Sequence, residues 1–299
     1  YYLGVYGTKY YVNSAAVRNQ GIDASIDFGH QFNKDFSMTF KGTFTYAHNE
    51  IRAYEESVGD RANLSRIGYS TSQQWGYVSD YLFADQTEIN NHPTQLIGGT
   101  VGPGDIKYVN QPNVYGVYDD IIDKNDMVPI GNPTTPEIVY GFGPSFHYKG
   151  FDFSALLQGL GGHKRLIGSY MAYAFYNGGQ IQRWQAESCW KEENPDKWAE
   201  YPRLETLNMN DTNLQTSDYW VRNASFLRVK NIQIGYTFPK AWTKKIGLEN
   251  VRVYVSGQNL FSFNSFYKGW DPENEIGTGD SPSYYPVNSI YSFGFNFKF

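Results

Sequence analysis

Residues 289–299 of the chain read SIYSFGFNFKF, with an aromatic side chain at every second position and a terminal Phe. Because successive side chains of a β-strand point to opposite faces, this segment has one apolar face and one polar face. A soluble sandwich would bury the apolar face in its core. A transmembrane barrel would turn that face toward lipid and the polar face toward its lumen. The aromatic positions are Tyr291, Phe293, Phe295, Phe297 and Phe299.

The composition favours the barrel. Of the 299 residues, 18% are aromatic, with 26 Tyr and 30 Gly, although only 40% are hydrophobic. Such aromatic-rich and glycine-rich strands are typical of outer-membrane barrels, whose alternating spans have a polar average hydropathy. The sequence has no apolar run near the roughly 18 residues that a transmembrane helix needs, which excludes a helical membrane protein. The net charge of -5 argues against a nucleic-acid partner. One cysteine, Cys189, can form no internal disulfide, and no Cys/His cluster predicts zinc.

Alternating segments recur along the chain and predict eight spans. Each span is expected to be about 10 to 15 residues long around a clearly alternating stretch, which exceeds the usual soluble strand and suffices to cross a bilayer at a tilt. The spans are expected at 2–12, 22–29, 36–46, 138–148, 151–158, 232–238, 251–258 and 289–299. On their polar faces, Asp27, Lys41, Arg252 and Gln258 are expected to face the lumen.

The connections between these spans alternate in length. Short ones are expected at 33–35, 149–150 and 239–250, and long ones at about 51–134, 161–223 and 263–287. Barrels of the outer membrane have short periplasmic turns and long extracellular loops. Unstructured loops of about 60 to 80 residues would be unusual in a compact soluble domain. The pattern therefore predicts an all-β fold, a transmembrane antiparallel β-barrel, with the C-terminal Phe on the periplasmic side.

Several segments, in order along the chain, also resemble the SusC/RagA family of TonB-linked outer-membrane transporters. They are IGNPTTPE (130–137), YGF (140–142), YKGFDF (148–153), SDYWVRNASFLRVKNI (217–232), GYTFP (235–239), VRVYVSGQNLF (251–261) and DPE (271–273). The resemblance implies that residues 1–299 are the C-terminal portion of a plugged barrel of about 22 strands, and supply about its last eight. The plug domain and the segment that contacts TonB would then lie upstream, in a longer polypeptide.

The same resemblance implies a function. The protein would import a nutrient actively across the Gram-negative outer membrane, driven through TonB, as the pore partner of a SusD-like surface lipoprotein. An oligosaccharide is the first choice of ligand and a peptide the second. The alternative is a complete eight-stranded barrel that acts as an adhesin or a passive pore, although side chains fill the interior of a barrel of that size. We expect no catalytic activity, since the five histidines are scattered and no G-x-S-x-G elbow is present.

Two groups of loop residues are candidate sites. Asp119, Asp123 and Asp126 lie in an acidic run that is similar to a calcium loop, but Asp120 stands where the sharp turn needs Gly, so the run also fits a solvated acidic turn. No other metal or cofactor is expected. Aromatic faces stack on sugars or fill partner pockets, but they also pack loop against loop. The candidates for ligand or partner contact are Trp75, Trp184, Trp190, Trp198, Trp220 and Trp270. A short helix is expected within 181–200, ending before Pro195.

Overall fold

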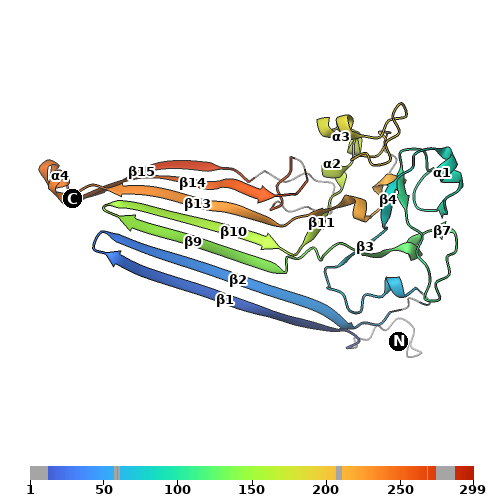
Figure 1. Ribbon diagram of the computed structural model, residues 1–299, viewed down its shortest axis with the longest axis horizontal. Helices are drawn as coiled ribbons and strands as arrows, with labels where there is room; N and C mark the ends of the chain where they lie inside the picture. Colours follow the sequence, from blue (N-terminus) through green and yellow to red (C-terminus); the bar gives the residue numbers. More distant parts are fainter. Residues whose placement is uncertain (1–12, 57–58, 60, 207–210, 268, 274–286) are drawn as a thin grey trace, which may run out of the picture. The chain divides into compact units, whose positions relative to one another are not determined.

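The computed structural model describes residues 13–56, 59, 61–206, 211–267, 269–273 and 287–299. The span predicted at 2–12 lies outside these residues. The chain forms two compact units (Figure 1). The sheet unit comprises Gly21–Ala47, Asn132–Gly179 and Trp220–Phe299, and the loop unit comprises His48–Gly131, Gln180–Tyr219 and the residues before Gly21. In the described part of the chain, no helix has the length and apolar character to cross a membrane.

The sheet unit is built around seven antiparallel strands that follow one another in chain order. This confirms the predicted all-β fold, and each of the seven strands overlaps one of the predicted spans. The first two strands are longer than expected, at 18 residues each. The strands are β1 (Ala16–Asn33), β2 (Phe36–Ala53), β9 (Ile138–Tyr148), β10 (Phe151–Gly161), β13 (Phe226–Thr237), β14 (Asn250–Asn264) and β15 (Ile290–Lys298).

The strand register places the predicted apolar positions of neighbouring strands beside one another. Phe153 of β10 pairs with Phe146 on one side and Ile234 on the other, and Val253 pairs with Phe295. We call this face of the sheet the apolar wall; it includes Phe44, Phe146, Phe153, Ile234, Val253, Val255, Phe293, Phe295 and Phe297.

The apolar wall is open to its surroundings. Phe295 is 53% exposed, and Phe44, Ile234, Val255, Phe293 and Phe297 are exposed too. Among the described residues, the buried hydrophobic side chains include none from β1, β2, β9, β10, β14 or β15. The side chains of the wall therefore do not meet a second layer, as they would in a soluble sandwich. An exposed apolar area of this extent is typical of a surface that contacts a membrane or another protein.

The opposite face of the sheet is polar and has ion pairs between strands. Lys41 Nζ of β2 lies 3.1 Å from Asp27 Oδ2 of β1. Arg252 Nε of β14 donates to Asp152 Oδ1 of β10 at 3.0 Å, across the intervening strand β13. Gly235 of β13 makes this possible, because a Cβ there would lie 2.5 Å from the Arg252 guanidinium. Polar and charged side chains thus share the face that was expected to line a lumen.

Three short connections join strands at one end of the sheet. Asn33 Oδ1 accepts from the backbone N–H of Asp35 at 2.9 Å and fixes the β1–β2 turn. Lys149 and Gly150 both have positive φ, +46° and +90°, in the β9–β10 turn. The third connection, expected as a short connection at 239–250, contains helix α4 (Lys240–Thr243) and a 3-10 turn η6 (Lys244–Ile246). All three are far shorter than the connections at the other end.

The loop unit has its own small core. Three two-stranded ladders join β3 (Gln74–Gly76) to β8 (Val128–Ile130), β4 (Ser79–Leu82) to β6 (Ile106–Tyr108), and β5 (Thr94–Gln95) to β7 (Ile121–Ile122). They bury Leu82, Phe83, Ile106, Tyr108 and Ile122. The helical elements are η1 (Ala62–Leu64), α1 (Gln86–Asn90), η2 (Lys124–Asp126), α3 (Arg183–Ser188) and η4 (Thr212–Leu214). Helix α3 confirms the short helix expected before Pro195.

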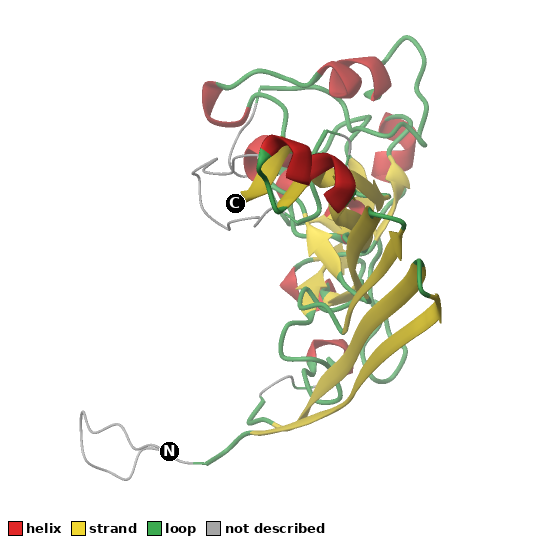
Figure 2. Ribbon diagram, turned by 90° about the vertical axis from the view of Figure 1, so that its left-hand side faces the viewer, coloured by secondary structure: helices red, strands yellow, loops and turns green. Residues whose placement is uncertain are grey.

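The remaining elements lie between β10 and β13. They are β11 (Lys164–Leu166), α2 (Ser169–Ala172), η3 (Tyr176–Gly178), η5 (Asp218–Trp220) and β12 (Val221–Asn223). Strands β11 and β12 pair with each other. The two ends of the connection expected as one loop at 161–223 are therefore hydrogen-bonded to each other in a short antiparallel ladder. Figure 2 shows the helices, in red, confined to the connections between strands.

Candidate functional site

The loop unit contains an open cleft of about 810 Å³. It lies between the start of α1, Pro103 and the segment that follows α3, and side chains of both charges line it. The polar lining includes Asp85, Gln86, Lys191, Glu192 and Arg203, and Trp190 adds an aromatic surface. A cleft of this size and mixed polarity can hold a small polar ligand.

Trp190 is the one tryptophan from the predicted set that lines this cleft. Its backbone N–H donates to Tyr201 O at 2.9 Å. Gly104 lies directly against its ring, since a Cβ at Gly104 would be 2.5 Å from Trp190 Cε3. Gly104 also has a φ of +85°, which disfavours any side chain at this position. The sequence GPGD at 102–105 therefore indicates a turn whose backbone packs directly against the Trp190 ring.

Arg203 connects the cleft to a buried carboxylate. Its Nε donates to Asp105 Oδ1 at 2.6 Å, and the Asp105 side chain is fully buried. Asp105 also accepts from Asn213 Nδ2 at 2.8 Å and from the backbone N–H of Gly102 at 2.7 Å. These hydrogen bonds fix the positions of the carboxylate and of the guanidinium.

Glu205 lies on the other side of Arg203, with its Oε2 2.7 Å from Nη2. Burial, together with the neighbouring Asp211 carboxyl, raises the pKa of Glu205 to about 8. The Glu205 carboxyl, beside Asp211, therefore holds a proton more readily than an isolated carboxyl does. Sequence reasoning missed Arg203, Asp105 and Glu205, because only the fold brings residues nearly 100 positions apart together.

Trp198 and the half-buried Tyr81 form a second surface in the loop unit. Trp198 is 67% exposed, and its ring centroid lies 5.4 Å from that of Tyr81. Lys107 Nζ and Lys197 Nζ each lie 4.4 Å from the Tyr81 centroid. These cation–π contacts hold Tyr81, and Lys197 Nζ also lies 5.5 Å from the Trp198 ring centroid. The remaining exposed surface of the Trp198 ring can stack on a ligand.

The other four predicted tryptophans make protein contacts. Trp75 packs on Tyr69 at 5.3 Å between ring centroids, and Trp184 donates its Nε1–H to Gln182 Oε1 at 2.9 Å. Trp220 is 1% exposed and meets Tyr173 edge to face at 5.4 Å. Trp270 is half-buried, and its backbone N–H donates to Tyr267 O at 3.1 Å.

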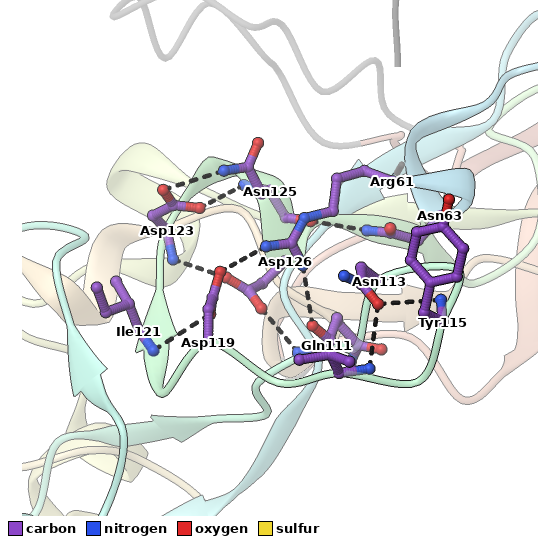
Figure 3. Close-up of polar contacts among 11 residues, drawn as sticks. Arg61, Asn63, Gln111, Asn113, Tyr115, Asp119, Ile121, Asp123, Asn125 and Asp126 are labelled. Carbon is purple, nitrogen blue, oxygen red and sulfur yellow. Dashed lines mark hydrogen bonds and ion pairs between the residues drawn. The ribbon is translucent and has the colours of Figure 1, made fainter. Parts of the chain in front are cut away.

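The acidic run forms a hydrogen-bonded turn (Figure 3). Asp123 caps η2 by accepting from the backbone N–H of Asn125 at 2.7 Å, and Asp126 accepts from the backbone N–H of Asp123 at 2.7 Å. Asp126 also accepts from the backbone N–H of Gln111 at 2.7 Å, and Asp119 pairs with Arg61. Burial raises the pKa of Asp126.

In this arrangement the carboxylates are engaged with protein donors. Calcium requires six or more oxygens that converge on one point, whereas these carboxylates are directed at N–H donors and at a guanidinium. In the described ranges, no three His, Cys, Asp or Glu side chains come together in a way that could hold a metal ion. The geometry is that of the acidic turn, and calcium binding remains an untested prediction.

The residues expected to face the lumen share the polar side of the sheet. Asp27 pairs with Lys41, and Arg252 pairs with Asp152, which sequence reasoning did not single out. Gln258 stands opposite Asn231 of β13. Their exposure to a lumen remains a prediction.

Comparison with known proteins identifies relatives over nearly the whole chain. The chain is 26% identical over 311 aligned positions to TonB-dependent receptor P3 of Formosa agariphila. The alignment covers 96% of this chain and 29% of the relative. The chain is also 26% identical over 304 positions to TonB-dependent receptor SusC of Bacteroides thetaiotaomicron, with coverages of 96% and 27%. No protein-family profile matches. The chain thus spans under a third of the length of these relatives.

Solved structures show the same fold. The RagAB peptide importer in its open-open state matches with a TM-score of 0.66 at 20% sequence identity, over 95% of this chain and 29% of that chain. Its closed-closed state matches with the same TM-score at 22% identity. The seven-stranded sheet is therefore part of a larger β-barrel.

Proposed function

The chain is a SusC/RagA-like portion of a TonB-dependent receptor barrel, and on this basis we propose that the full-length protein imports a nutrient across the Gram-negative outer membrane. The exposed apolar wall, with charged side chains on the opposite face, is the observation that supports this most. Such a sheet suits a barrel wall between lipid and a water-filled interior. The adhesin or passive-pore alternative gains no support from relatives that are receptors and importers.

The ligand we propose first is an oligosaccharide. The exposed Trp198 ring beside Tyr81 is the kind of flat aromatic surface on which a sugar ring stacks. A peptide is the second candidate, because the cleft around Arg203 offers cationic, anionic and amide groups to a zwitterionic ligand. RagAB, a structural relative, is described as a peptide importer.

We further propose that a SusD-like lipoprotein covers the loop unit and that TonB supplies the energy through a segment outside this chain. The name SusC among the relatives, and the RagAB assembly among the solved structures, support this partnership. The protein is not expected to be an enzyme, in keeping with relatives that are receptors and importers.

The test is binding and uptake by the full-length protein purified with its lipoprotein. Glycan and peptide panels are titrated by calorimetry, and growth on each ligand is compared between the intact strain and a deletion strain.

In the Trp198→Ala variant, glycan affinity should fall roughly three- to tenfold, as expected for a lost aromatic contact. Trp75→Phe is the control. Binding of peptides alone, unaffected by Trp198→Ala, would replace the oligosaccharide with a peptide. Growth of the deletion strain equal to that of the intact strain on every ligand would contradict import.

A further inference from the structure

The connection between β13 and β14 is a compact helical segment at the short-turn end of the sheet. The backbone N–H of Trp242 donates to Pro239 O at 2.9 Å, and that of Gly247 donates to Lys244 O at 3.2 Å. Gly247 ends the segment with a φ of +77°. We call residues 239–247 the turn helix. Its backbone hydrogen bonds give it a defined backbone conformation.

Two large apolar side chains of the turn helix are uncovered. Trp242 is 61% exposed and Ile246 is 70% exposed. They are four residues apart, which places them on the same side of a helical turn. Exposed tryptophan is uncommon on water-facing surfaces, but it is enriched where a protein crosses the boundary between membrane and water.

Aromatic contacts connect Trp242 to the apolar wall. Tyr236 of β13 lies 4.4 Å from Phe151 of β10 between ring centroids, and both belong to the apolar wall's side of the sheet. Tyr236 then contacts Phe238 at 5.1 Å, and Phe238 contacts Trp242 at 6.5 Å. The apolar surface of the sheet therefore continues without interruption onto the turn helix.

Three lysines complete the turn helix. Lys240, Lys244 and Lys245 are all exposed. In the residues that the structure describes, no ion pair involves any of them, and Glu249, the acidic residue of this connection, instead pairs with Lys298 at 2.6 Å. The segment therefore has an excess of positive charge directly beside apolar side chains that continue the apolar wall.

We propose that the turn helix is a membrane-interface anchor, in which Lys240, Lys244 and Lys245 bind the phosphates of anionic phospholipids in the periplasmic leaflet while Trp242 and Ile246 enter the headgroup region. Lysines at the edge of an apolar surface bind anionic headgroups while their stems stay among apolar groups. The inference rests on the outer-membrane placement proposed above.

The test uses the full-length protein in nanodiscs of phosphatidylcholine, with or without phosphatidylglycerol. The triple variant K240Q/K244Q/K245Q is compared with a control of equal charge change, R66Q/K124Q/R183Q, which alters exposed residues of the loop unit. Each lysine at an anionic surface is worth about a fivefold change in affinity. We expect the turn-helix variant to bind phosphatidylglycerol at least about tenfold more weakly in lipid titrations, while the control binds like the wild type. Equal binding by both variants would overturn the proposal.

A second measurement addresses Trp242 directly. Brominated phosphatidylcholine quenches fluorescence only where lipid contacts the indole, so the difference in quenching between wild type and Trp242→Phe reports on that residue. A difference that is largest for bromines near the headgroup supports the anchor. No difference would show that protein covers Trp242 and would overturn it. If the protein failed to insert into either nanodisc, the membrane placement itself would be wrong, and this outcome is distinct from a lost lipid preference.

Discussion

At the scale of single residues, Gly235 determines whether two charges on different strands can meet. Arg252 and Asp152 lie on β14 and β10, and the Arg252 side chain reaches Asp152 over the backbone of Gly235. Any side chain at Gly235 would occupy the space of the ion pair. The absence of a side chain at Gly235 thus allows the ion pair to connect β10 and β14 across β13.

This arrangement predicts the outcome of a double-mutant cycle. Arg252→Gln and Asp152→Asn should show a coupling of about 0.5 to 1 kcal/mol in unfolding free energy, as is typical of a partly exposed ion pair. In a Gly235→Val background the coupling should fall to near zero. Gly29→Val is the control, since a Cβ at Gly29 meets only Thr39 Cγ2, at 3.6 Å. Undiminished coupling in the Gly235→Val background would contradict this role.

His163 makes the stability of the sheet unit depend on pH. Its side chain is 1% exposed, and both ring nitrogens are buried without a hydrogen-bond partner. Burial, with a smaller effect of nearby Arg165, lowers the pKa of His163 to about 4. Because the folded-state pKa lies below the unfolded value of 6.5, the neutral ring favours the fold above pH 6.5. That stability is lost as pH falls from 6.5 toward 4.

We therefore expect wild-type protein to lose up to about 3 kcal/mol of unfolding free energy between pH 6.5 and 4 through this group. The variant His163→Leu should lack this part of the pH dependence, while His30→Leu, at an exposed position, should retain it. Urea unfolding in lipid vesicles at a series of pH values is the measurement. Identical pH profiles for wild type and His163→Leu would rule the effect out.

Some of these residues follow from the sequence and others do not. Alternation alone placed Arg252 and Lys41 on the polar face, because a strand has a period of two. The partner of Arg252 could not be predicted, since it depends on the register of three strands and on a glycine between them. Likewise, nothing in the local sequence separates the buried Trp220 from the exposed Trp198, because loop burial is decided by distant contacts such as Tyr173 and Tyr81.

At the scale of elements, the turn between β9 and β10 is strained at one position. Lys149 has a φ of +46°, in the left-handed region that disfavours most side chains, whereas Asn and Gly adopt it readily. The following Gly150 is required, because its φ is +90° and a Cβ there would lie 2.6 Å from Thr237 O. The pair forms the kind of two-residue turn in which Asn-Gly is preferred.

Lys149→Asn should therefore raise the unfolding free energy by about 0.5 to 1 kcal/mol by relieving the left-handed strain. Gly150→Ala should lower it, since the added methyl group meets the Thr237 carbonyl. Both are measured by chemical unfolding from lipid vesicles. A Lys149→Asn protein that is less stable than wild type would show that the lysine makes a contact that outweighs the strain.

The strands themselves were largely predictable, and the connections were not. The predicted spans at 138–148 and 151–158 agree with β9 and β10 to within a few residues, since strict alternation is a strong local signal. By contrast, 239–250 appeared only as a short connection, and the turn helix was missed. A helix of one or two turns has no periodicity to detect, and its formation depends on the strands that bracket it.

At the scale of the whole molecule, charge is distributed unevenly between the two units. The segments 48–131 and 180–219 contain twenty acidic and nine basic residues, whereas the sheet unit contains ten acidic and fourteen basic residues. The acidic loop unit and the lysine-bearing turns thus present different potentials. The loop segments thus carry a net negative charge and the sheet unit a net positive one.

The central claim is that the apolar wall contacts acyl chains, and adjacent residues of β14 test it most directly. Val255 pairs with Ile234 and Phe293 on the apolar wall, whereas Ser256 pairs with Gln233 and Ser292 on the polar face. The measurement is the unfolding free energy, in lipid vesicles, of Val255→Arg and Ser256→Arg in the full-length protein. We predict that Val255→Arg costs about 2 to 4 kcal/mol and Ser256→Arg less than about 1 kcal/mol. Equal costs at the two positions, or a larger cost at Ser256, would contradict the account.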